Sequence, residues 1–447
     1  MHVSPTATNK DSVKFILRVP GIAEPNTYAL SYDDENTVQS LDFLLFENEV
    51  LVVLPVSISA YAVDPDDSRF LSFNTQIPKG IFDIVLIANA HNEIVSSVDS
   101  SSIGLSKTEV LSQLKISNAG KWKVKKADQN FDPIPMWGEI KDFSVPKTPH
   151  PVVEVPMIRT LAKINVFITE SASENFILTS VRIHNYYDKA CIVPAGENWD
   201  DENLTVTAPT IPEDAKKPAG VAQCLIYDTV WELNDSGCEN SIYLFESEIS
   251  NDGDQYFNET CLVIGGYYQD DLSPSYYRVD FANLHDGIRS NLPLLRNHLY
   301  KININTITHR GFTTPLEAFV LEDHNHSTEI IFWDESKFNE VVFNENTMLG
   351  VSESNLYFSK DQYNNASNNN FLYVTTNNWE GWTVQRIVDV DDVPIDWLTL
   401  TPTSGSQHET NEIRLLLDEN MHGARIAYIY LRAGKLMHKI TVHQEGI

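Results

Sequence analysis

The stretch from Ile134 to Ile168 decides how this chain is divided. It begins with IPMWGE at 134–139, continues through a connector rich in proline, and ends with PMIRTLAKINVFI at 156–168. In that last segment apolar residues recur at every second position, the periodicity of a β-strand with one buried face. The residues sharing the predicted core face are Ala162, Ile164, Val166 and Ile168, and Phe167 is an exception on the face of Lys163, Asn165 and Thr169.

The connector before this strand contains four prolines. They are Pro146, Pro149, Pro151 and Pro156. Proline has no backbone N–H to donate to a neighbouring strand and it favours extended backbone. The connector is therefore predicted to act as a hinge that spaces two β units and belongs to neither sheet, with Arg159 to Ile168 as the opening strand of the second unit.

Length and charge narrow the classes of protein. The chain has 447 residues, enough for roughly three domains, and a net charge of −30 with a pI near 4.7. Because phosphate binding draws on clustered Lys and Arg, neither nucleic acid nor an anionic membrane surface is an expected partner. The most apolar run, 50–63, is shorter than the roughly 20 residues of a membrane span. Residues 1–12 lack the pattern of an export signal, which is therefore expected to be absent from this chain.

The chain has four cysteines, all within residues 191–261. They are Cys191, Cys224, Cys238 and Cys261. Their number and spacing do not fit a disulfide framework, and no CxxC pair indicates zinc or a redox site. Buried free thiols are the favoured interpretation, and a disulfide within this segment is the alternative.

Residues 1–156 are predicted to form a first β unit. Val13, Phe15, Leu17 and Val19 alternate with polar residues and predict a strand over 13–19 at the edge of a sheet, ending at the turn signal Pro20-Gly21. One helix is predicted after Ser106, because Ser106 and Glu109 have the spacing of a capping box and apolar residues follow at helical intervals.

The same strand-like style continues through residues 157–320, which are predicted to form a second β unit of similar size. An acidic stretch with few apolar residues, 321–346, is predicted to be a linker. Short strands at regular spacing over 347–447 predict an immunoglobulin-like sandwich. The fold class is therefore all-β, with three sandwiches in a row.

Catalytic and metal-binding motifs are missing from the sequence. It has no HExxH, GxSxG, P-loop or GxGxxG after a strand, so no enzymatic activity and no cofactor are predicted. The acidic residues from Asp389 to Asp392 could suggest calcium, but Pro394 and Leu400 stand where an EF-hand needs Gly and Glu, which favours a solvated loop. His324 and His326 lie in a polar stretch, where a surface loop is preferred over a metal site.

Three tryptophans of the third unit are candidates for a ligand contact. They are Trp379, Trp382 and Trp397. Exposed indoles can pack against the CH faces of sugars, whereas most tryptophans of a sandwich lie in its core. Trp379 is the predicted surface residue, because polar and turn-forming residues surround it, namely Asn377, Asn378, Glu380 and Gly381.

A series of short motifs adds a resemblance to a known family. In chain order they are VPG (19–21), LDFLLF (41–46), DIVLIANA (83–90), IPMWGE (134–139), RTLAKINV (159–166), APTIP (208–212), SIYLFESE (241–248), LVIGGYY (262–268), YYRVDF (276–281) and LLRNHLYKI (294–302). Over about residues 13–320 the chain thereby resembles the fimbrillin superfamily of Bacteroidales, the FimA and Mfa-like type V pilins. Residues 397–405, 424–434 and 440–446 are similar to the BACON-like immunoglobulin-type modules of the same bacteria.

The resemblance implies two transthyretin-like sandwiches in tandem in a subunit at the bacterial surface, exported as a lipoprotein precursor. It also implies assembly by strand exchange, in which a protease removes the first strand and a neighbouring subunit fills the groove. On this sequence the removable strand is 13–19, with Phe15, Leu17 and Val19 as its plugs. The implied location is extracellular and associated with the outer membrane, and the implied partners are other fimbrial subunits.

Two features depart from the family pattern. The loop 21–37 has no Arg or Lys, and Tyr28 stands where cleavage would require Arg; Arg18 lies inside the predicted strand, where a folded sheet would protect it. A whole domain follows the second unit, so no free donor strand is expected at the end of the chain. The second departure favours a tip or accessory adhesin that binds a surface protein or glycan, and the first alone favours an unprocessed anchor subunit. The alternative function is a glycan-binding surface protein that does not polymerise.

Overall fold

The protein is mostly β, with several sheets. The computed structural model describes residues 10–19, 34–64, 70–125, 130–144, 152–201, 204–218, 223–230, 232–234, 237–249, 258–285, 288–321, 326–334, 340–343, 347–360, 370–390, 392–407 and 409–446. The described residues up to Asp334 form one compact unit, and those from Glu340 onward form another. The sequence predicts three units. In the structure the first two predicted units form one compact unit, because they share a buried apolar cluster.

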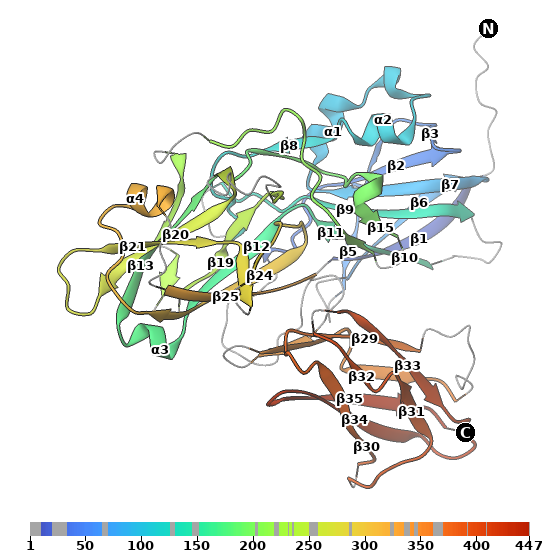
Figure 1. Cartoon of the computed structure of the whole chain (residues 1–447). Helices are drawn as coiled ribbons and strands as arrows, with labels where there is room; N and C mark the ends of the chain where they lie inside the picture. The colour runs from blue at the N-terminus through green and yellow to red at the C-terminus, as the bar shows by residue number, and fades with distance from the viewer. Residues whose placement is uncertain are drawn as a thin grey trace. The chain divides into compact units, whose positions relative to one another are not determined.

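Two sheets pack against each other in the first part of the N-terminal unit, here called the first sandwich (Figure 1). One sheet has the strand order β10 (Val152–Pro156), β1 (Lys10–Arg18), β6 (Phe70–Pro78), β5 (Ala62–Val63). The other has the order β11 (Ile158–Arg159), β9 (Met136–Ser144), β7 (Ile81–Ala88), β2 (Leu41–Glu47), β3 (Val50–Leu51), with β4 (Val56–Ser57) also paired to β2. Their inner faces share one buried apolar cluster.

A second sandwich follows in the same unit. Its five-stranded sheet has the order β18 (Leu233–Asn234), β19 (Gly237–Leu244), β12 (Ala162–Ile168), β24 (His298–Ile307), β25 (His326–Asp334). The facing sheet has the order β17 (Leu225–Asp228), β13 (Phe176–His184), β20 (Cys261–Tyr268), β21 (Ser275–Asp280). Two-stranded pairs complete the unit, namely β8 (Lys115–Ser117) with β14 (Lys189–Cys191), β15 (Trp199–Asp200) with β16 (Thr205–Val206), and β22 (Ala282–His285) with β23 (Ile288–Asn291).

The prediction of a spacer over the proline-rich connector is wrong for its described part. β10 pairs in parallel with β1, and β11 pairs with β9, so both strands belong to the first sandwich. β10 lies at the end of its sheet, where a proline costs no ladder hydrogen bond on the outer side. The predicted strand from Arg159 to Ile168 is likewise two strands, one in each sandwich.

The predicted linker 321–346 also contains paired strands. β25 runs antiparallel to β24, and β26 (Glu340–Phe343) runs antiparallel to β27 (Met348–Val351). Each is the last strand of its sheet. An edge strand needs backbone partners on one side only, so it tolerates a polar sequence that resembles a connector.

The helices are short. The predicted one is present as α2 (Lys107–Leu111), capped by Ser106, whose hydroxyl accepts from Glu109 N while Glu109 accepts from Ser106 N. The other helical segments were not predicted; they are α1 (His91–Ser97), η2 (Ser100–Ser102), α3 (Glu170–Ser173), η3 (Gly196–Asn198) and α4 (Pro315–Val320). Segments of three to seven residues are too short for a helical hydrophobic period to stand out.

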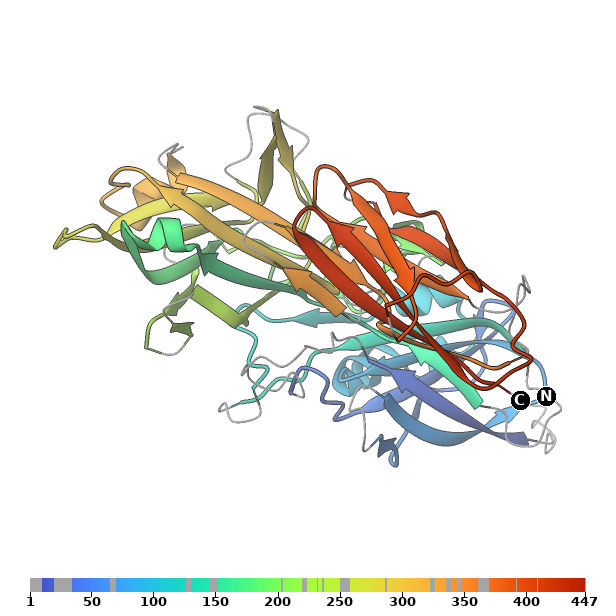
Figure 2. The same ribbon diagram turned by 90° about the horizontal axis from the view of Figure 1, so that it is seen from below.

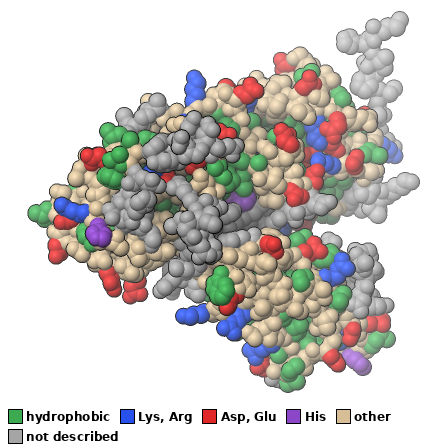
Figure 3. Space-filling view, in the orientation of Figure 1, with side chains coloured by type: hydrophobic (Ala, Val, Ile, Leu, Met, Phe, Trp, Pro, Cys, Tyr) green, Lys and Arg blue, Asp and Glu red, His purple; other side chains and the backbone are tan. Residues whose placement is uncertain are grey.

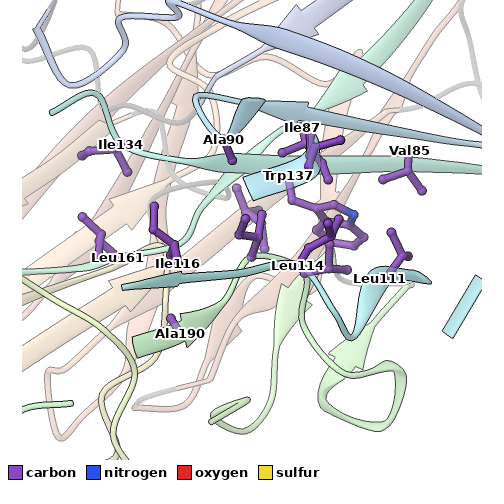
Figure 4. Packing of buried hydrophobic residues seen from close by; sticks show 14 of the residues in the cluster. Val85, Ile87, Ala90, Leu111, Leu114, Ile116, Ile134, Trp137, Leu161 and Ala190 are labelled. Atoms are coloured by element: carbon purple, nitrogen blue, oxygen red, sulfur yellow. The ribbon is translucent and has the colours of Figure 1, made fainter. Parts of the chain in front are cut away.

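A shared apolar cluster explains why two sandwiches make one compact unit. Figure 4 shows Val85, Ile87 and Trp137 of the first sandwich together with Leu161 and Ala190 from beyond it. Tyr243, Phe245 and Leu295 of the second sandwich belong to the same cluster. Separating the sandwiches would expose these side chains to water, at roughly 25 cal/mol for each Å² of apolar surface. The described parts of the stretch, 134–144 and 152–168, are therefore a packed join and not a hinge.

The C-terminal unit consists of two five-stranded sheets around a core of its own. The first has the order β26, β27, β29 (Phe371–Thr376), β33 (Asn411–Leu417), β31 (Leu398–Thr401). The second has the order β28 (Asn355–Phe358), β35 (Leu436–Gln444), β34 (Arg425–Ala433), β30 (Trp382–Val388), β32 (Ser404–Gly405). Figure 2 shows the long strands of this unit lying side by side.

Many acidic side chains lie at the surface. Figure 3 shows Asp and Glu scattered over one face of the molecule, interspersed with Lys and Arg. Such a distribution supports solubility more than a single docking site.

A buried group of charges joins residues 35 and 36 to the second sandwich. Glu35 Oε1 accepts from Lys163 Nζ at 2.7 Å and from the Tyr243 hydroxyl at 2.6 Å. Beside them Arg159 donates to Asn36 Oδ1 at 2.7 Å. The sequence pattern placed Lys163 on a solvent-facing side of β12, and this is wrong: Lys163 is 3% exposed, because it neutralises Glu35 inside the protein.

The stability that this group of charges contributes depends on pH, because Glu35 can be protonated. Burial alone would raise the pKa of Glu35, but the charges of Lys163 and Arg159 outweigh it and hold the pKa below its ordinary value of 4.5. A lowered pKa in the folded state stabilises the fold above pH 4.5, and this contribution is lost as the pH falls through the lowered value.

We therefore expect Glu35→Gln to lower the free energy of unfolding of the N-terminal unit by about 3 kcal/mol at pH 7, because it leaves Lys163 buried without its carboxylate. The difference from the unaltered protein should shrink as the pH falls from 7 through the lowered pKa of Glu35, where Glu35 itself becomes protonated. Urea denaturation over this pH range measures this, with the exposed Glu213→Gln as control. A difference that stays the same until the protein unfolds in acid would contradict the assignment.

Candidate functional site

The predicted plug residues of β1 lie in the core of the first sandwich. Val13, Phe15 and Leu17 are completely buried and Val19 is 1% exposed, while Ser12 is exposed and the residues between them are partly exposed. β1 therefore has the alternation that the sequence predicts, and one face of it is a row of apolar side chains inserted between the two sheets.

Phe15 lies at the centre of an aromatic group. Its ring stacks on Phe73 with centroids 5.3 Å apart, meets Phe43 edge-on at 5.8 Å and lies 6.1 Å from Phe143. These partners come from β6, β2 and β9, so one side chain of β1 touches both sheets. Aromatic contacts of this kind add to the free energy of burial.

The prediction that β1 is an edge strand is wrong. β1 pairs antiparallel with β6 from Lys10 to Arg18 and parallel with β10 from Lys14 to Arg18 (Figure 1). The sequence pattern shows which face of a strand is buried but not how many neighbours the strand has. If β1 left, β6 and β10 would border a groove about 10 Å wide, since neighbouring strands lie about 4.8 Å apart.

Arg18 is held within this sheet, as the sequence predicts. Its carbonyl accepts from Met157 N at 2.9 Å, and its side chain lies 3.3 Å from a Glu154 carboxylate oxygen. A protease requires an extended, unpaired backbone, so Arg18 is protected while the sheet is intact. Tyr28 and most of the loop after β1 lie outside the described residues.

The four cysteines are free thiols, as the favoured interpretation of the sequence predicts, and the alternative disulfide within residues 191–261 is not formed. Cys191, Cys238 and Cys261 are buried and Cys224 is partly exposed. Burial raises the pKa of Cys238 and of Cys261 to about 12, so neither thiol is reactive near neutral pH.

Trp379 lies at the tip of the turn between β29 and β30. It is 74% exposed, whereas Trp382 is completely buried and Trp397 packs against the core, with Arg425 4.0 Å above its ring. Hydrogen bonds from Glu380 N to Asn378 Oδ1 and from Gly381 N to Asn378 O fix the turn. The exposure of Trp379 agrees with its polar surroundings in the sequence; its contact with a ligand stays a prediction.

Gly381 gives this turn its conformation. Its φ is +74°, and a Cβ at this position would lie 1.9 Å from the carbonyl oxygen of Gly405. Only glycine fits both conditions, so the turn presents Trp379 in a defined place.

The sequence also raises metal binding at the acidic residues 389–392 and at two histidines. Within the described ranges, no group of three or more His, Cys, Asp or Glu could hold a metal ion. Asp389 and Asp392 close a turn, in which Val393 N donates to Asp389 Oδ1 and Arg386 pairs with Asp392 at 2.6 Å. His324 lies outside the described residues. The helices of the described chain include none long and apolar enough to cross a membrane.

The fold and the site define a class: a β-rich, two-unit protein whose first strand is inserted between two others. Comparison with known proteins finds similarity in structure to cell adhesion and fimbrial proteins of Bacteroidales, at low identity. No family model matches the chain, and neither does any curated protein.

Three of the similar solved structures show the range of similarity. A Parabacteroides distasonis protein assigned to cell adhesion has a TM-score of 0.42 and 15% identity, over 73% of this chain and 100% of its own. The tip fimbrial protein Mfa3 of Porphyromonas gingivalis, with a C-terminal truncation, has a TM-score of 0.42 and 15% identity, over 72% and 100%. A fimbrial assembly protein of Parabacteroides distasonis has a TM-score of 0.37 and 12% identity, over 67% and 92%.

The geometry of β1 gives a direct test of its inward and outward faces. Phe15→Ala should lower the free energy of unfolding of the N-terminal unit by about 3–5 kcal/mol, because it leaves a cavity among three aromatic rings. Ile16→Ala, on the outward face of the same strand, is the matched control and should cost about 1 kcal/mol or less. Equal losses in the two variants, measured by urea denaturation, would show that β1 does not have this orientation.

Proposed function

We propose that this protein is a non-enzymatic fimbrial subunit at the cell surface, a tip or accessory adhesin that assembles by β-strand exchange. The observation that carries the proposal is β1 itself. It is a short strand near the start of the described chain, it is paired on both sides, and its apolar side chains fill the space between two sheets. The order of sequence motifs that resembles fimbrillins supports the same function.

Strand exchange follows from the physics of such a groove. A groove without β1 would expose unpaired backbone groups of β6 and β10 and the apolar residues around Phe15. An incoming strand regains these interactions only if its own side chains alternate in the same way. The donor is therefore expected to place an aromatic residue at the position of Phe15, flanked at every second position by aliphatic residues in place of Val13 and Leu17.

The state of β35 favours a terminal position in the fimbrium. This strand is paired in parallel with β28 and antiparallel with β34, and Ile440 and Val442 are completely buried. Held on both sides, β35 is not free to act as a donor for another subunit. The subunit would then receive a donor strand without β35 supplying one, and the C-terminal unit would be presented to a surface protein or glycan.

The test places a site-specific protease sequence at residues 23–29, after β1, and follows uptake of a fluorescent peptide of residues 10–20 by anisotropy. Cleaved protein should exchange its β1 for the peptide, and uncleaved protein should not, because its own strand stays attached. A peptide with Phe15→Asp is the matched control and should bind at least tenfold more weakly. A donor-strand peptide of a stalk pilin is the second ligand.

No uptake of any peptide by cleaved protein at high micromolar concentration would refute strand exchange. Equal uptake of the two forms of the β1 peptide would refute the role of Phe15 as a plug.

A second candidate function is glycan binding at Trp379 without polymerisation. The specific observation is an indole that is 74% exposed on a turn fixed by Gly381. The CH faces of sugar rings gain from contact with an accessible aromatic face, and an indole offers a large one.

A glycan array with the unaltered protein and with Trp379→Ala tests this function. Reproducible binding that is lost in Trp379→Ala would support it. Tyr357→Ala is the matched control, because Tyr357 is an aromatic residue of the same unit and is 73% exposed. Binding that is lost equally in both variants, or in neither, would exclude a specific role for Trp379.

A further inference from the structure

The N-terminal unit contains a cleft of about 400 Å³ that the proposed function does not use. One wall is formed by α2 and β9, and the other by the segment 191–199 with Thr210. Its volume lies within the usual range for sites that bind small ligands or single side chains. Two indoles line it, Trp137 and Trp199, whose rings meet edge-on with centroids 5.0 Å apart.

A buried ion pair, Arg296 with Glu246, fixes the wall formed by residues 191–195. Arg296 is completely buried and donates to the carbonyl oxygens of Cys191 and Ile192 at 2.8 Å each, and to Glu246 Oε2 at 2.6 Å. Glu246 also accepts from Thr210 N at 3.1 Å. This ion pair is neutral as a whole, so it stabilises the wall without adding charge to the cleft. The cleft is thus formed before any ligand arrives.

The opposite wall of the cleft packs against the shared apolar cluster. Figure 4 shows Trp137 packed with Ile87, Leu111 and Leu114. Trp137 is 3% exposed and Leu114 is completely buried. The indole therefore has little freedom to move aside.

The charges of the cleft are unbalanced. Lys107 Nζ lies 2.7 Å from Asp83 and 3.7 Å from Glu49, and it also contacts Glu139, so three carboxylates surround one ammonium group. The side chains of Lys107, Asp83 and Glu139 are only 8–10% exposed. Glu49 is 66% exposed, so water screens its charge, but among the described residues the two buried carboxylates still share a single ammonium group.

The rim of the cleft repeats this imbalance. Lys141 is already paired with Asp201 at 2.5 Å, and Asp201 also accepts from Trp199 Nε1 at 2.9 Å. Glu197 adds another carboxylate on the exposed side. Among the described residues, Glu49, Glu139 and Glu197 line the cleft together with Lys107 and Lys141, while Asp83 and Asp201 lie outside the lining and each pairs with one of these lysines, so carboxylates outnumber ammonium groups.

The pKa of Glu139 agrees with an excess of carboxylates around it. Burial raises the pKa of Glu139 above its ordinary value, even though Lys107 and Lys141 act in the opposite direction, and Asp83 adds to the rise. A further positive charge in the cleft would relieve this carboxylate.

We propose that the cleft binds an organic cation, an ammonium or guanidinium group on an apolar stem, such as the Lys or Arg side chain of a partner polypeptide. Carboxylates attract the charge, while indole rings accommodate the stem and interact favourably with a cation. The net charge of −30 on the chain adds long-range attraction for a basic partner. This site is independent of strand exchange, so failure of either proposal leaves the other standing.

Calorimetric titration of the full chain tests the proposal with defined probes. Nα-acetyl-lysine N-methylamide should bind saturably with a Kd of about 1 mM. The norleucine analogue has nearly the same stem without the ammonium group, and it should bind at least tenfold more weakly. Cadaverine separates the two sources of the cation: tighter binding of cadaverine than of the lysine probe would identify a free diamine as the ligand and would overturn the assignment to a partner side chain.

Two variants connect the binding to this cleft. Glu139→Gln should weaken binding of the lysine probe about tenfold, and Glu197→Gln, on the exposed rim where folding is not at risk, about threefold. Glu174→Gln, an exposed glutamate outside the cleft, is the matched control and should leave the affinity unchanged. The proposal is overturned if the norleucine analogue binds equally well, if no probe binds at 50 mM, or if Glu197→Gln binds as the unaltered protein does.

Discussion

The backbone pairing of β1 is the constraint on which the first sandwich depends. This strand is hydrogen-bonded to β6 on one side and β10 on the other, so it closes the sheet as well as filling the core. Main-chain hydrogen bonds are indifferent to sequence, whereas the row from Val13 to Val19 requires side chains of particular sizes. The first property allows any strand to enter the groove, and the second selects the strand that fits. A subunit that exchanges strands needs both.

The two sandwiches of the N-terminal unit are tied by interactions of different kinds. A shared apolar cluster is one of them, and it is tolerant of small displacements. The buried group of Glu35, Lys163 and Arg159 is not tolerant, because a displacement would leave charges inside the protein without partners. Residues 35 and 36 are held by contacts with Lys163, Tyr243 and Arg159.

The cleft beside Trp137 shows the opposite use of buried charge. Around Glu35 the charges are compensated within the chain, whereas around Glu139 carboxylates are in excess. An excess of carboxylates lowers the stability of the fold, and a cationic ligand in the cleft, as proposed above, would offset it. Glu35 and Glu139 look alike in the sequence, but they lie in different electrostatic surroundings.

Local patterns in the sequence determined the parts of the structure that depend on near neighbours. The alternation from Val13 to Val19 gave the buried face of β1, Ser106 and Glu109 gave the start of α2, and the polar residues around Trp379 gave its exposure. The tertiary structure alone decided that β10 covers the outer side of β1, that β25 and β26 extend two sheets, and that Lys163 is buried. The physical reason is that a strand's neighbours and a charge's partners are set by residues far away in the chain: Lys163 and Glu35 are 128 positions apart. The period of a strand records which face is buried, but it carries no information about what lies across from it.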